Sequence, residues 1–139
     1  MEYDKIYTKN RNAYNEYEII YSLECGMVLQ GIDVKNIKNN KMNLTSSFGE
    51  ILNKEVFLRN VGVDGQNISI KLLLNKNQIV KLTKELESDG VTLIPLIIYL
   101  SKNRIKCELG LARGLKKFDK RESIKNKEIV KSKTYKIKL

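Results

Sequence analysis

Residues 109–124 read Leu109-Gly-Leu-Ala-Arg-Gly-Leu-Lys-Lys-Phe-Asp-Lys-Arg-Glu-Ser-Ile124, and they divide the chain into two parts. Before Gly114 the apolar residues have the spacing of a packed domain, whereas after it basic residues dominate. From Lys116 to the end there are ten Lys or Arg residues against three carboxylates, which is most of the chain's net charge of +10. The sequence therefore predicts a compact body over residues 1–115 and a cationic arm over residues 116–139.

The body has the pattern of a small, mainly β domain. Short segments rich in Ile, Val, Leu and Tyr predict strands, the first of them with a bend or bulge at Gly26. Tight turns are expected at Asn53-Lys54 and Lys102-Asn103, and Pro95 is expected at an edge or a bulge. Residues 3–15 are expected to be an extended lead-in with little core, and residues 62–66 a loop. The predicted strands are 16–29, 46–52, 55–61, 68–73, 91–100 and 104–111.

Two helices are predicted between these strands. Residues 31–38 place apolar side chains one turn apart and form a short helix. Asn75 is a natural N-cap with Gln78 three positions on, which is the capping-box spacing, and Gly90 is the expected C-terminal stop. Short antiparallel strands with two or three helices, in a chain of 139 residues, predict a partly open barrel with the helices packed on it.

The composition excludes several classes of function. The chain has no histidine and two separated cysteines, Cys25 and Cys107, which excludes paired Cys/His zinc sites and mechanisms that need an imidazole base. Both cysteines are expected to be small apolar residues on strands, without a disulfide. No Gly-rich phosphate loop is present, and Glu16 and Glu18 are expected to face solvent rather than form a catalytic pair. We expect no metal, no cofactor and no enzymatic activity.

The charge points to a polyanionic partner, because the sequence pI is about 9.6. No apolar run approaches the length of about 20 residues that a membrane span needs, and the start of the chain has no secretion signal. The apolar residues of the arm form no continuous stripe of the kind that a membrane-surface helix needs. Nucleic acid is therefore favoured over an anionic membrane, and the free arm is expected to be largely unfolded.

The residues alone leave two classes of binding function open. One is a generic OB-fold protein that binds single-stranded RNA, which would show little preference for a tRNA-shaped molecule. The other is a module for anionic membranes or for other proteins.

Six motifs in order resemble the SsrA-binding protein family, SmpB, over nearly the whole chain. The motifs are Gly26-Met-Val-Leu-Gln-Gly-Ile-Asp-Val-Lys35, Val56-Phe-Leu58, Lys71-Leu-Leu-Leu74, Thr92-Leu-Ile-Pro-Leu96, Glu108-Leu-Gly-Leu-Ala-Arg-Gly114 and Phe118-Asp-Lys-Arg-Glu-Ser-Ile-Lys125. The resemblance implies an OB-like antiparallel six-stranded barrel with two or three flanking helices and a disordered basic C-terminal tail.

The resemblance also implies partners and a place of action. Members of the family hold the tRNA-like domain of transfer-messenger RNA and deliver it, with elongation factor Tu, to stalled ribosomes for trans-translation. The tail then orders in the decoding centre and the empty message channel. This implies a protein of the bacterial cytoplasm, or of an organelle of bacterial origin, with no membrane partner.

Matching the family's motifs position by position implies two sets of site residues. The implied RNA-binding residues are Asn10, Arg11, Asp33, Lys35, Gly114 and Lys116. The implied decoding-centre residues of the tail are Phe118, Asp119, Lys120, Arg121, Lys125 and Lys127. The chain departs from the family in a much shorter loop over residues 62–70, in Leu115 within the expected Gly-Lys-Lys, and in Ile129 where the tail usually has Trp.

Overall fold

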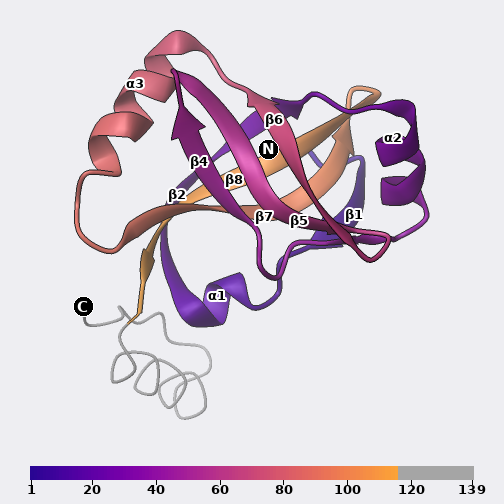
Figure 1. Cartoon of the computed structure of the whole chain (residues 1–139), viewed down its shortest axis with the longest axis horizontal. Coiled ribbons are helices and arrows are strands. Elements are labelled where there is room, and N and C mark those ends of the chain that lie inside the picture. The colour runs from indigo at the N-terminus through magenta and orange to yellow at the C-terminus, as the bar shows by residue number, and fades with distance from the viewer. Residues whose placement is uncertain (116–139) are drawn as a thin grey trace.

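Antiparallel strands and three helices make up residues 1–115, the part of the chain that the computed structural model describes (Figure 1). The helices are α1 (Ala13–Glu16), α2 (Gly31–Lys38) and α3 (Lys76–Glu85). The strands are β1 (Lys5–Lys9), β2 (Tyr17–Met27), β3 (Met42–Asn43), β4 (Phe48–Leu52), β5 (Glu55–Val63), β6 (Gln66–Leu73), β7 (Val91–Ser101) and β8 (Arg104–Gly114).

Six of these strands close on themselves. The hydrogen-bonded order runs β7-β4-β5-β6-β2-β8, and β8 pairs again with β7. The ladder between β4 and β7 is the shortest in the ring, with Gly49 and Leu93 as its one pair of partners in the described residues. The predicted antiparallel, mainly β fold with flanking helices is confirmed, and the ring has the predicted six strands, but it is closed where a partly open barrel was predicted. Two short strands were not predicted: β1 pairs with β7, and β3 pairs with β5.

Two-residue turns connect three of the hairpins. Asn53 and Lys54 have φ of 52° and 64°, and Lys102 and Asn103 have φ of 52° and 63°, as their sequences predict. The prediction of a loop over residues 62–66 was wrong. There, Val63 pairs with Gln66 around Asp64-Gly65, whose φ values of 50° and 80° suit a tight turn. Asp-Gly between two apolar strands is itself a strong hairpin signal.

The first 16 residues are also more ordered than predicted. They form β1 and α1, with Asn10 and Ala13 only 5% and 2% exposed. The reason lies in β7, whose buried residues are continuous instead of alternating with exposed ones. One face of β7 lines the ring, so the other face needs a cover, and α1 supplies part of it. This outer cluster consists of Ala13, Ile94, Leu96, Ile97, Tyr99 and Ala112.

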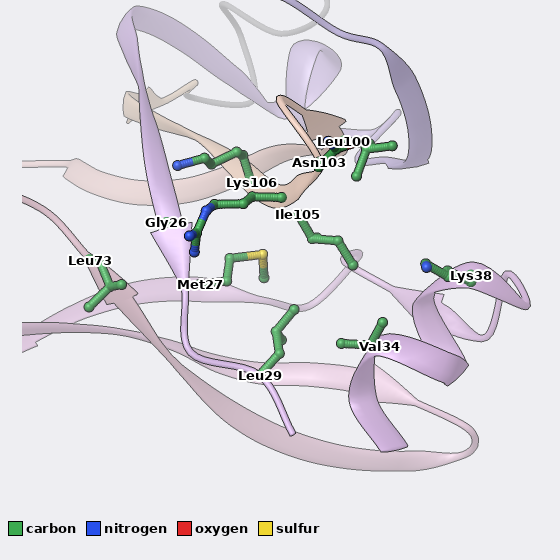
Figure 2. Close-up of a pocket in the computed structure, with 11 residues that line it drawn as sticks. Gly26, Met27, Leu29, Val34, Lys38, Leu73, Leu100, Asn103, Ile105 and Lys106 are labelled. Atoms are coloured by element: carbon green, nitrogen blue, oxygen red, sulfur yellow. The ribbon is translucent and has the colours of Figure 1, made fainter. Parts of the chain in front are cut away.

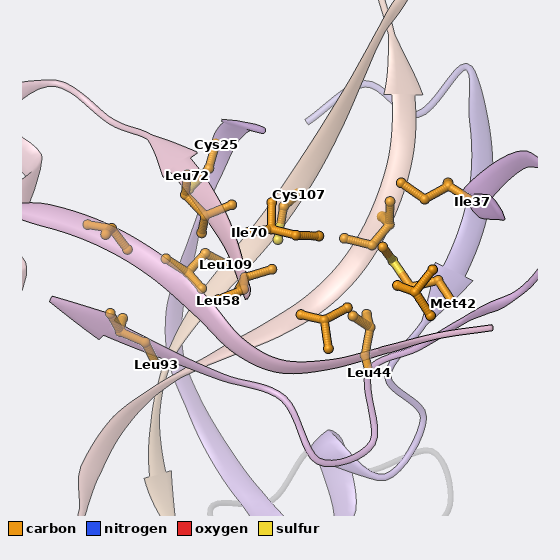
Figure 3. Packing of buried hydrophobic residues seen from close by; sticks show 14 of the residues in the cluster. Cys25, Ile37, Met42, Leu44, Leu58, Ile70, Leu72, Leu93, Cys107 and Leu109 are labelled. Carbon is orange, nitrogen blue, oxygen red and sulfur yellow. The ribbon is translucent and has the colours of Figure 1, made fainter. Parts of the chain in front are cut away.

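The interior of the ring is the main core. Figure 3 shows apolar side chains from several strands and from α2 converging there, among them Leu58, Leu109 and Ile37. Cys25 and Cys107 lie in this core as free thiols, each 0% exposed, so their predicted role as apolar filling is confirmed. No helix within residues 1–115 is long and apolar enough to cross a membrane.

The sequence predicted the start of α3 correctly but not its end. Asn75 Oδ1 accepts from Gln78 N at 2.8 Å, and Gln78 Oε1 accepts from Asn75 N at 3.0 Å. The helix ends at Glu85, before the predicted stop at Gly90, which instead adopts φ +77° at the entry to β7. The expected bulge at Pro95 is present in the β7–β8 register. The β2–β8 register has no shift at Gly26, where a bend or bulge was expected, and is instead irregular between Ile19 and Tyr21.

The contact between β4 and β7 predicts a sensitive position. A Cβ atom at Gly49 would lie 2.6 Å from Leu93 Cβ, so a side chain there must push the two strands apart. We expect Gly49→Ala to lower the free energy of unfolding by about 1–3 kcal/mol in urea denaturation. Gly31→Ala is the matched control, because nothing lies within 4 Å of the added atom. Equal unfolding midpoints for the two variants would contradict this account of ring closure.

Candidate nucleic-acid interface

A hollow of about 310 Å³ opens between α2, the end of β2 and the β7–β8 hairpin (Figure 2). Met27, Leu29, Val34 and Ile105, drawn together in Figure 2, are four of its apolar lining residues, and Leu73 and Leu100 are the others. The remaining lining residues are Gly26, Lys38, Asn103, Arg104 and Lys106. The hollow is therefore apolar at its centre and carries polar and cationic side chains from several elements.

The charge of this hollow is one-sided. Lys38, Arg104 and Lys106 contribute three cations, and no Asp or Glu is among the lining residues. The ion pairs found within residues 1–115 use other cations, namely Lys41 with Asp64, Arg59 with Glu50, and Lys71 with Glu55. Cations that are not neutralised by a neighbouring carboxylate are available to phosphate oxygens. The apolar centre suits a sugar or a base face better than a second phosphate.

Helix α2 presents part of this surface and is fixed at both of its ends. Asp33 accepts from Gln30 N at 3.1 Å in a capping box, and Ile37 is fully buried in the core. The sequence singled out Asp33 and Lys35 on this helix. In the structure the Asp33 carboxylate caps the helix and Lys35 is exposed, whereas Val34 and Lys38, which lie one turn apart on one face, line the hollow.

The second group of predicted residues lies beside α1, at a different end of the molecule from α2 (Figure 1). Arg11 is exposed just before α1. Gly114 pairs with Tyr17 at the end of β8, and the next backbone amide, Leu115 N, donates to Glu16 O at 3.1 Å. Leu115, the last described residue, therefore lies next to α1. The structure brings Arg11 and Gly114 to one end and places Asp33 and Lys35 at another.

Asn10 has partners within the protein. Its side-chain amide donates to Pro95 O at 3.0 Å and to Leu44 O at 3.4 Å, from a site that is only 5% exposed. The amide thus ties the segment before α1 to the Pro95 bulge and to the chain before β4. Its direct contact with RNA stays a prediction, and we propose that Asn10 acts by positioning the exposed Arg11.

The different roles proposed for Asn10 and Arg11 can be measured. We expect Asn10→Ala to lower the free energy of unfolding by about 1–3 kcal/mol, because two buried carbonyls lose their donor. Arg11→Ala should leave the unfolding midpoint nearly unchanged and weaken RNA binding instead. Urea denaturation and an RNA gel shift on both variants separate the roles. A stable Asn10→Ala protein with weakened RNA binding would show that Asn10 contacts the RNA itself.

A second polar cluster lies outside the ring on β2 and β8. Glu108, 8% exposed, accepts from the Tyr3 hydroxyl and from Ser22 Oγ at 2.8 Å. Glu24, its direct cross-strand partner, accepts from the Tyr99 hydroxyl at 2.5 Å. Burial and the hydrogen bond to Glu108 raise the pKa of Tyr3 to about 12, and the pKa of Tyr99 is raised for the corresponding reasons, with Glu24 as acceptor. These hydroxyls remain donors near neutral pH and compensate two carboxylates that face each other.

The predicted site residues of the arm lie outside the described residues. They are Lys116, Phe118, Asp119, Lys120, Arg121, Lys125 and Lys127. Sequence reasoning missed Lys38, Arg104 and Lys106 as a group. The position of Lys38 one helical turn after Val34 was a usable signal, but nothing local joins Lys38 to a hairpin more than 60 residues later.

Comparison with known proteins places this arrangement in a family. A sequence profile described as SmpB protein matches residues 7–139. SsrA-binding proteins from Enterococcus faecalis and Thermosynechococcus vestitus are each 42% identical over 135 residues. The first alignment covers 90% of this chain and 88% of the relative, and the second covers 89% of each. The SsrA-binding protein of Mycoplasmopsis pulmonis is 42% identical over 132 residues, covering 89% of this chain and 91% of the relative.

The fold agrees with these sequence matches. A chain in the solved structure described as "tmRNA-SmpB: a journey to the center of the bacterial ribosome" superposes with a TM-score of 0.65 at 32% identity. The match covers 84% of this chain and 93% of that one. With a profile that spans almost the full length and relatives above 40% identity, this chain belongs to the SmpB family.

Proposed function

We propose that this chain binds the tRNA-like domain of transfer-messenger RNA and delivers it to stalled ribosomes for trans-translation. The support is the family itself, whose members are named SsrA-binding proteins, and the structural match to a chain from a tmRNA-SmpB structure of the bacterial ribosome. In this role the protein makes and breaks no bond. It binds transfer-messenger RNA and presents it to the ribosome, with elongation factor Tu as a further member of the delivery complex.

The observation that carries the proposal is the hollow beside α2. Lys38, Arg104 and Lys106 come from different elements and converge on an apolar centre without a lining carboxylate. A folded RNA offers such a surface phosphates, 2′-hydroxyls and exposed base faces at fixed spacings. Cations held on a helix and a hairpin are preorganised for one spacing of phosphates. The ring is therefore suited to a folded RNA rather than to a strand that can adapt to any groove.

The two ends of the molecule suggest a division of work. The hollow between α2 and the β7–β8 hairpin is the proposed main contact with the tRNA-like domain, and the exposed Arg11 beside α1 is a proposed second contact. Leu115, after which the arm follows in sequence, lies beside α1 at a different end, which supports a second partner for the arm while the hollow is occupied. We assign that partner as the small ribosomal subunit, with Phe118, Asp119, Lys120 and Arg121 in the decoding centre and Lys125 and Lys127 further along the message channel.

A competition gel tests the proposal. The labelled tRNA-like domain is bound by the full chain and challenged either with the same RNA unlabelled or with single-stranded RNA of equal length. We expect the unlabelled domain to compete at least about tenfold better at physiological salt, because shape and 2′-hydroxyl contacts add to the general phosphate attraction. Equal competition would favour the generic single-strand binder. Sedimentation with anionic vesicles at the same salt is the test for a membrane module.

A further inference from the structure

The two cysteines, 82 positions apart in sequence, are direct neighbours in the fold. Cys25 on β2 and Cys107 on β8 are paired partners in the antiparallel register. Each is 0% exposed, and both belong to the cluster inside the ring, where Figure 3 draws them close to Leu72, Ile70 and Leu109. Direct partners in an antiparallel pair project to the same face of the sheet. Both thiols therefore enter the same part of the core.

The spacing of such partners suits a covalent bond. Directly opposed residues in antiparallel strands have Cα atoms about 4.5 to 5.5 Å apart, and disulfides join Cα atoms about 4.4 to 6.8 Å apart. No group of three His, Cys, Asp or Glu residues within residues 1–115 could hold a metal ion, so a shared metal does not account for the pair. The ladder instead holds the two thiols in place on strands that pair over nearly their whole length.

We propose that Cys25 and Cys107 are a dithiol that closes to an intramolecular disulfide across β2 and β8 in the presence of a low-molecular-weight disulfide. One cysteine thiolate attacks the reagent, whose S–S bond breaks and releases one thiolate, leaving a mixed disulfide. The second cysteine thiolate then attacks the cysteine sulfur of that mixed disulfide and releases the other half. Two cysteines are oxidised, one reagent disulfide is reduced to two thiols, and the cysteine protons end on the released thiols.

Burial decides when this reaction takes place. The pKa of Cys25 is raised by burial and then by Glu24 to about 12, and burial raises the pKa of Cys107 well above its ordinary value. Only the thiolate attacks a disulfide, and a reagent cannot enter a closed core. The bond therefore forms during folding or when β2 and β8 separate transiently, and it then prevents their separation. The neighbouring pair, Gly26 and Lys106, lines the hollow, so the bond lies next to the candidate RNA surface.

The test compares refolding with the native state. Reduced full-length protein is unfolded in urea and diluted into buffer containing oxidised glutathione, while native protein is incubated in the same buffer. We expect the refolded product to be a monomer that has lost two hydrogen atoms, with the peptides of Cys25 and Cys107 joined in a proteolytic map. Its thermal midpoint should exceed that of the reduced protein, and dithiothreitol should reverse both changes. Native protein should react at least about tenfold more slowly.

Single-cysteine variants are the matched controls. Cys25→Ala and Cys107→Ala each keep one thiol and should give only a glutathione adduct or an intermolecular dimer. The refolding experiment on the unsubstituted chain tests the proposal even where one of these variants fails to fold. A refolded product made only of glutathione adducts or intermolecular dimers would overturn the proposal. So would an intramolecular disulfide with a thermal midpoint below that of the reduced protein, because the register would then not accommodate the bond.

Discussion

A chain that ends at Leu115 is expected to bind the tRNA-like domain almost as well as the full protein and to support no tagging on stalled ribosomes. The hollow that we assign to the RNA is built wholly from residues before Leu115. The arm holds most of the net charge, but Leu115, the last described residue before it, lies beside α1 and does not line the hollow. At physiological salt, exposed charges act over only about 8 Å. Losing the arm should therefore change this affinity by no more than about threefold.

Two measurements on the truncated chain separate the outcomes. A gel shift with the tRNA-like domain reports the body, and peptide tagging in a reconstituted translation system with a message lacking a stop codon reports the arm. The matched control is a full-length chain with residues 116–139 in scrambled order, which keeps composition and charge. Tagging by the scrambled chain would mean that charge alone is sufficient. Loss of RNA binding on truncation would refute the division between body and arm.

Replacing the three cations of the hollow should weaken binding of the tRNA-like domain, which truncation of the arm should leave almost unchanged. In the variant Lys38→Gln, Arg104→Gln, Lys106→Gln, each lost phosphate contact is expected to cost about 1 kcal/mol, so affinity for the tRNA-like domain should fall by about 100-fold. The slope of log affinity against log salt should become shallower by roughly two to three, one for each lost contact. Filter binding over a range of salt concentrations measures both quantities.

A second triple variant controls for net charge. Lys54→Gln, Lys76→Gln and Lys84→Gln remove the same charge from residues that do not line the hollow. This variant should stay within about threefold of the unsubstituted chain, with a nearly unchanged salt slope. If both triple variants lose affinity equally, RNA binding depends on overall charge and not on the hollow. The generic single-strand binder would then be the better description.

The sequence predicted part of the candidate site. Family motifs indicated Asn10, Arg11, Asp33 and Lys35, and the structure shows the hydrogen-bond partners of Asn10 and Asp33. The Asn10 amide is bound to Pro95 O and Leu44 O, and the Asp33 carboxylate caps α2. A motif indicates that a residue type matters at a position but does not distinguish a contact with RNA from support of the backbone. Burial and hydrogen-bond partners make that distinction.

The sequence by itself determined what depends on a few neighbouring residues. Asn53-Lys54 and Lys102-Asn103 form turns because the asparagine of each pair tolerates positive φ, and α3 starts where Asn75 and Gln78 can satisfy each other's backbone amides. The concentration of charge after residue 115 is likewise a property of composition alone.

Only the tertiary structure decided what depends on strands far apart in sequence. The contact of Gly49 with Leu93 closes the ring, the β2–β8 register pairs Cys25 with Cys107, and the fold sets Lys38 and Lys106 around one hollow. The fold also leaves β7 buried on both faces, so β1 and α1 are ordered where the local sequence indicated an extended lead-in. Turns and helix caps are stabilised within about four residues, whereas register between distant strands is set by packing the whole core at once.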